Sequence, residues 1–70
     1  MTNKMKIELF EKALEFENKS IEYQELYEKR PNNITLKETQ MEYFDKFEGA
    51  YEMLKILGLD NEYIEWAEGK

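Results

Sequence analysis

The chain contains no cysteine and no histidine, and its 70 residues include a single serine, Ser20. Without cysteine there is no disulfide framework, and without histidine the most frequent metal ligand and general base is missing. The three glycines stand far apart, so no glycine-rich phosphate loop is present. Nucleophilic catalysis needs an activated side chain beside a base, and the residue types for such a pair are lacking. We therefore expect a protein that is not an enzyme and that binds no metal and no cofactor.

Long hydrophobic runs are also absent. No stretch approaches the roughly 20 apolar residues that a helix needs to cross a membrane. The first residues lack the apolar segment of a secretory signal. These features predict a cytoplasmic protein without a membrane partner.

Positive charge is scarce, with 10 basic against 16 acidic side chains and a net charge of −6. Residues 1–35 carry six basic and seven acidic side chains, whereas residues 36–70 carry four and nine. The excess of negative charge therefore belongs to the second half of the chain. Because nucleic-acid phosphates repel such a surface, we expect no direct nucleic-acid partner.

Apolar side chains, in contrast, recur at alternating steps of four and three residues, the spacing of a helix face that packs against another helix. Such stripes predict two long amphipathic helices, over residues 4–29 and 36–57, joined by a turn at residues 30–34 that contains Pro31. The stripe of the second helix is Leu36, Gln40, Tyr43, Phe47, Ala50, Leu54 and Leu57, and that of the first is Ile7, Phe10, Leu14, Glu17, Ile21 and Gln24.

Capping signals favour the same boundaries. Thr2 or Asn3 is a candidate N-cap of the first helix, and Thr35 with Glu38 matches a capping box for the second. Asp60 is a candidate N-cap of a short third helix over residues 61–68. The predicted fold class is therefore all-α: residues 1–70 form a single domain, a long antiparallel helical hairpin plus a short C-terminal helix.

Glycine and its neighbours predict where the second helix ends. Gly58 can adopt the left-handed conformation after the helix, with Leu59 folding back on Leu54 in a Schellman motif. Gly49 lies inside the predicted helix, where it either permits close helix approach or is a weak point.

The first helix carries two adjacent apolar strips that together span about 200° of its surface, about twice what one neighbouring helix covers. The first strip is Ile7, Phe10, Leu14 and Ile21, and the second is Leu9, Ala13, Phe16, Tyr23 and Tyr27. One strip therefore needs a further cover: the third helix, a second copy or another protein.

We predict that a second copy provides this cover and that the chain dimerises into a four-helix bundle. A closed three-helix monomer and a dedicated heterologous partner remain as alternatives. The residues predicted to form the apolar seam of the interface are Leu9, Ala13, Phe16, Tyr23, Tyr27, Tyr43, Phe47 and Leu54.

Polar residues interrupt the stripes at Glu17, Gln24 and Gln40. They lie either at solvent-exposed edges of the seam or in hydrogen bonds that cross it and fix the helix register.

No family motif is present, so the function is predicted from surface properties alone. The leading hypothesis is a small non-enzymatic interaction or structural protein that acts through its helical seams. The alternative is an acidic inhibitor that mimics nucleic acid and docks on a basic enzyme or DNA-binding protein. The candidate acidic docking face is Glu38, Asp45, Glu48 and Glu52.

Overall fold

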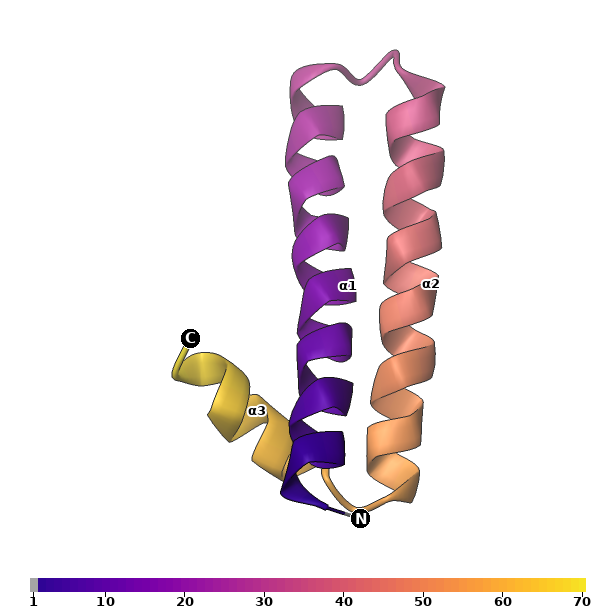
Figure 1. The fold of residues 1–70 in the computed structure, drawn as a ribbon. Coiled ribbons are helices and arrows are strands. Elements are labelled where there is room, and N and C mark those ends of the chain that lie inside the picture. Colours follow the sequence, from indigo (N-terminus) through magenta and orange to yellow (C-terminus); the bar gives the residue numbers. More distant parts are fainter. Residues whose placement is uncertain (1) are drawn as a thin grey trace.

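The computed structural model describes residues 2–70, and this part of the chain folds into three helices: α1 (Asn3–Lys29), α2 (Ile34–Ile56) and α3 (Asp60–Glu68). Helices α1 and α2 run antiparallel beside each other over their whole length, and α3 packs obliquely near the open end of the hairpin (Figure 1). The molecule is elongated, with extents of 44 × 22 × 17 Å. The predicted all-helical hairpin is confirmed.

Helix α1 begins and ends at the signals expected from the sequence. The Thr2 hydroxyl accepts a hydrogen bond from the Met5 N–H at 3.1 Å, which satisfies one free amide of the first turn. The helix ends before Pro31, and the Asn33 N–H donates to the Arg30 carbonyl at 3.0 Å to close the turn.

Helix α2 begins two residues earlier than predicted. Its N-cap is Asn33, whose side-chain oxygen accepts a hydrogen bond from the Leu36 N–H at 3.3 Å. The predicted capping box at Thr35 is therefore wrong, and Thr35 lies inside the first turn. Asn33 has the extended conformation of an N-cap, and from it the side chain reaches the free amide of Leu36.

The end of α2 is the predicted Schellman motif. Gly58 has a φ of +72°, and the Leu59 N–H donates to the Leu54 carbonyl at 2.8 Å. The Gly58 N–H donates to the Lys55 carbonyl at 3.0 Å, the second bond of the motif.

Helix α3 follows at once, and its first residue is Asp60. The N-cap position belongs to Leu59, and no side chain caps the helix, so the prediction that Asp60 is the N-cap is wrong. Asp60 lies instead in the first turn with Glu62, where carboxylates favour the positive end of the helix dipole.

The core lies where the three helices meet. Phe10, Ala13, Leu54 and Tyr63 are buried to 2% exposure or less. The ring of Phe10 lies 5.6 Å from that of Tyr63 and 5.5 Å from that of Trp66, so α3 packs on α1 through aromatic contacts. Within residues 2–70, no helix combines the length and the apolar character that crossing a membrane requires.

Candidate interaction surface

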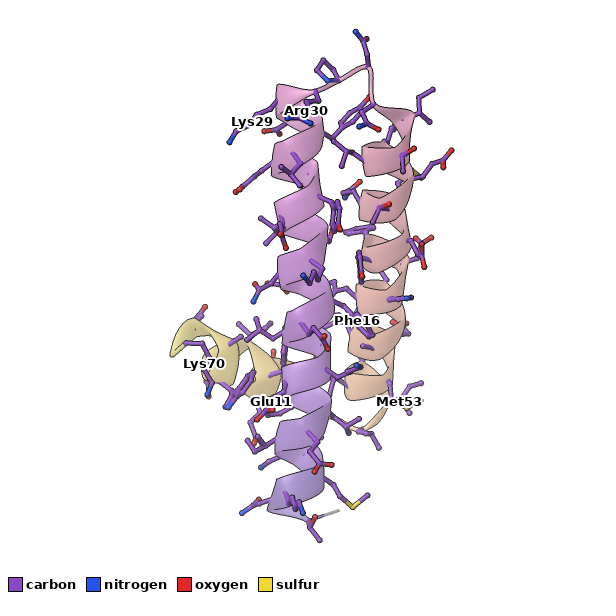
Figure 2. All side chains as sticks on the ribbon, turned by 45° about the horizontal axis from the view of Figure 1, so that its top comes forward. Glu11, Phe16, Lys29, Arg30, Met53 and Lys70 are labelled. Atoms are coloured by element: carbon purple, nitrogen blue, oxygen red, sulfur yellow. The ribbon has the colours of Figure 1, made fainter. Side chains whose placement is uncertain are left out.

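The structure places the eight predicted seam residues inside the hairpin of one chain. Ala13 and Leu54 are completely buried, and the other six are half-buried. The rings of Tyr23 and Tyr43 stack between the helices at 5.8 Å, and Phe16 lies at the same seam (Figure 2). Ala13 and Leu54 thus have no surface for a second chain in this conformation, and an intermolecular role of the whole seam stays a prediction.

The two apolar strips of α1 are covered in the opposite sense to the expected one. Helix α2 covers the second strip, for which the sequence predicted a second copy as the cover, with the third helix or another protein as alternatives. Helix α3 covers Phe10 and Leu14 of the first strip through Tyr63 and Trp66. Ile21, the last residue of the first strip, lies further toward the turn than Phe10 and Leu14 and is 46% exposed. The apolar surface that remains is therefore smaller than predicted.

Lysine side chains cover the solvent edge of the seam. Lys12 and Lys46 lie over the two sides of the Phe16 ring, with their Nζ atoms 5.4 and 5.9 Å from its centroid. Lys46 also lies 5.3 Å from the Tyr43 centroid, and Lys37 lies 5.8 Å from that of Tyr27. Their alkyl stems shield the rings while their charges stay in water.

One polar contact crosses the seam. The Gln40 amide donates a hydrogen bond to the Ser20 hydroxyl at 3.3 Å, and Ser20 is only 5% exposed. For Gln40 this confirms the hydrogen-bonding hypothesis. Gln24 is exposed, and Glu17 is half-buried near α3.

Tyr63 is the most perturbed titratable residue of the described chain. Burial and the nearby Glu17 carboxylate raise its pKa to about 12. Its hydroxyl is buried and forms no hydrogen bond with residues 2–70, so Glu17 acts on it as a neighbouring charge and lies outside hydrogen-bond geometry. A buried hydroxyl without a partner destabilises the folded state.

A stripe of side chains, all exposed except the half-buried Tyr51, runs along α2 toward the flank that faces α3. Tyr51 contacts Tyr63 of α3, with ring centroids 6.2 Å apart. Phe44 lies seven residues before Tyr51, almost two whole helical turns, and therefore on the same flank. Phe44 is 46% exposed and Met41 is 52% exposed. We call this set the outer stripe: Ile34, Lys37, Met41, Phe44, Glu48 and Tyr51.

Ile21 of α1 borders the outer stripe. It lies eleven residues after Phe10, close to three whole turns, so it points to the side on which α3 packs. The Ser20–Gln40 hydrogen bond and the Tyr23–Tyr43 stack place it at the level of Phe44. The exposed apolar side chains of α1 and α2 are thus expected on the same side of the hairpin, between α3 and the turn.

The predicted acidic face lies on the outer side of α2. Glu38, Asp45, Glu48 and Glu52 are all exposed. Within residues 2–70, Glu52 is the one member of this set in an ion pair, with Lys55 at 3.9 Å. The face is therefore a surface of largely unneutralised carboxylates.

The hollows of the described surface are open. One of about 440 Å³ lies between α1 and α3, beside Leu14, Glu17 and Ile64. Another, of about 630 Å³, follows the turn from Lys29 to Ile34. Among residues 2–70, no group of three acidic side chains is arranged to hold a metal ion.

Sequence reasoning missed the outer stripe as a unit. The signal was available, because its members follow one another at steps of three, four, three, four and three residues. Two charged positions hid it, since Lys37 and Glu48 break the apolar pattern.

A scan against protein-family models gave no match to this chain, and searches of curated proteins and of solved structures gave none either.

Proposed function

We propose that this protein is a small, non-enzymatic helical protein that works by protein–protein association, with a second copy of itself as its first partner. The surface that supports this proposal is the apolar part of the outer stripe together with Ile21.

The exposure of Phe44 carries the proposal. Nearly half of its ring is in water, although the same helix has aromatic side chains that are largely covered by α1. Burying a phenylalanine stabilises a protein by about 1.5–3 kcal/mol, so a small domain gains much from covering this side chain. Its neighbours Met41 and Ile21 are exposed to a similar extent, and together they form a patch of the kind found at interfaces.

Light scattering coupled to size exclusion, across a hundredfold range of protein concentration, tests this proposal. We expect the wild-type chain to form a dimer and Phe44→Asp to remain a monomer with unchanged helix content. Ile56→Asp is the matched control, because Ile56 is 76% exposed on the same helix but lies beyond the outer stripe. A wild-type chain that stays monomeric throughout would refute self-association.

A second candidate function rests on the acidic face of α2: docking to a basic protein. The four carboxylates extend over about 21 Å of helix. Duplex DNA carries about 12 phosphates over that length, so the face has roughly a third of the charge density of the nucleic acid it would mimic. This comparison ranks acidic mimicry below self-association.

The triple variant Glu38→Gln, Asp45→Asn, Glu52→Gln separates the two candidates. It neutralises the acidic face outside the outer stripe and leaves Glu48 in place. Acidic docking predicts that this variant no longer binds a basic DNA-binding protein in a pull-down at low salt. Self-association predicts an unchanged dimer.

A further inference from the structure

The charges of the outer stripe match those of a second copy in one orientation only. Counted from its centre, between Met41 and Phe44, the stripe has the same spacing in both directions. A second α2 that runs antiparallel across this centre brings Met41 opposite Phe44 of the other copy. It also brings Lys37 opposite Glu48 of the other copy, and does so twice because the pair is two-fold symmetric. A parallel copy in register would set Lys37 against Lys37 and Glu48 against Glu48.

We propose that two copies of this chain pair antiparallel through the outer stripe of α2. The pair has a Met41–Phe44 centre and two Lys37–Glu48 ion pairs, one on each side of that centre. This inference rests on the proposed self-association and adds its surface and its orientation.

The position of α3 agrees with this arrangement. The overlap of the two α2 helices ends where Ile34 of one copy meets Tyr51 of the other. Tyr51 also contacts α3, because its ring centroid lies 6.2 Å from that of Tyr63. The second copy therefore occupies the exposed length of the stripe above α3, and Ile21 borders the same surface.

Lys37 and Glu48 are both exposed. Lys37 also lies over the Tyr27 ring, but at the solvent edge of the seam, so each residue can be changed without disturbing the buried core. Lys37→Glu sets two glutamates against each other at both ends of the interface, and Glu48→Lys does the same with lysines. We expect each variant to dimerise at least tenfold more weakly than the wild type in sedimentation equilibrium. The double variant restores both pairs with reversed polarity, so we expect it to regain wild-type affinity. A mixture of the two single variants should form a heterodimer.

Glu42→Lys is the control for charge reversal. Glu42 is an exposed glutamate of the same helix, but it lies about 120° away from Glu48 around the axis. It should dimerise like the wild type. Far-UV circular dichroism of every variant checks that the helices are intact.

A spin label at Ile56→Cys reads the orientation directly, because the chain has no other cysteine. An antiparallel pair separates the two labels by about 40 Å along the axis. A parallel pair brings them to within about 10 Å of helix spacing plus the length of the labels.

The outcomes separate the two proposals. A wild-type dimer that loses affinity with either single variant and regains it with the double variant supports the antiparallel pair. If neither charge reversal changes the dimer affinity, or if the two spin labels lie close together, the antiparallel pair is overturned and self-association still stands. A monomeric wild-type chain overturns both.

Discussion

At the residue scale, Gly49 inside α2 and Gly58 just after its end show how one residue type can have opposite effects on the stability of a helix. Gly49 lies inside α2, and apart from its chain neighbours and the nearby backbone of its own helix no described atom lies within 4 Å of the position that a Cβ would take. The sequence left open whether Gly49 allows close helix approach, and this open space identifies it as a weak point of the helix. Gly58 has a φ of +72°, which other residues rarely adopt.

We therefore expect Gly49→Ala to raise the free energy of unfolding by about 1 kcal/mol, because alanine favours the helix. Gly58→Ala should lower it by about 1 kcal/mol, because the left-handed conformation strains a Cβ. Urea unfolding followed by circular dichroism measures both changes. Two shifts of the same sign would contradict the roles assigned to these glycines.

Tyr63 makes the free energy of unfolding depend on pH in the alkaline range. Its pKa is raised to about 12 in the folded chain, whereas an unfolded tyrosine ionises near its ordinary value of 10.0. The folded state thus holds its proton while the unfolded state loses it. The free energy of unfolding is therefore unaffected by ionisation of this tyrosine below pH 10. As the pH rises from 10 to 12, the free energy of unfolding falls by up to about 3 kcal/mol.

Tyr63→Phe removes this loss, and it also removes a buried hydroxyl that has no hydrogen-bond partner within residues 2–70. We expect the variant to be as stable as the wild type at pH 7, or more stable by about 1 kcal/mol, and less sensitive between pH 10 and 12. Urea unfolding at a series of pH values measures this difference. Tyr27→Phe, at the far end of the hairpin, should keep the wild-type alkaline profile; if it does not, the effect does not belong to Tyr63.

At the element scale, α3 depends on a few aromatic contacts. Tyr63 and Trp66 pack on Phe10, and Lys6 of α1 forms an ion pair with Glu62. Because Trp66 is the only tryptophan, its fluorescence reports on α3 alone. We expect Tyr63→Ala to release α3, so that Trp66 emission shifts to longer wavelength while most helix signal of α1 and α2 remains.

Ile64→Ala is the matched control, since Ile64 lies on the same helix but is 41% exposed. The wavelength of Trp66 emission in this variant should equal that of the wild type. An unchanged spectrum in Tyr63→Ala would show that Trp66 packs without the Tyr63 contact.

Which of the two apolar strips of α1 packs against α2 is also a property of the helices as elements. The strip that α2 covers contains Ser20 at the position that completes its heptad spacing. Counted as polar, Ser20 interrupts this strip, just as Glu17 and Gln24 interrupt the other one, so polar interruptions alone do not decide which strip faces α2. In the structure the serine is small enough to be buried, and Gln40 satisfies its hydroxyl. A small hydroxyl side chain should therefore be counted as compatible with a helix seam.

At the scale of the whole molecule, the core is small for a chain of this length. Among residues 2–70, four apolar residues are buried to 2% exposure or less, whereas ten large apolar residues are exposed. Association that covers part of this surface should stabilise the folded state by an amount that rises with the logarithm of protein concentration. We expect the midpoint of thermal unfolding to rise across a hundredfold range of concentration, as measured by scanning calorimetry.

Phe44→Asp provides the comparison. Its midpoint should not depend on concentration, because the apolar centre of the outer stripe is interrupted. A concentration-dependent midpoint in this variant would place self-association on another surface.

The helices were determined by the sequence itself, because helix starts, stops and apolar periodicity depend on residues close together in the chain. Pro31, Gly58 and the heptad spacing were sufficient for an all-helical hairpin with a short third helix. Two N-caps were misplaced by one or two residues, since Asn33 and Leu59 depend on the conformation of the preceding turn. Which strip of α1 faces α2, where α3 packs and which side chains stay exposed were decided only by the tertiary structure. The physical reason is that two adjacent strips of nearly equal hydrophobicity compete for one neighbour, and close packing around small residues such as Ala13 and Ser20 selects between them.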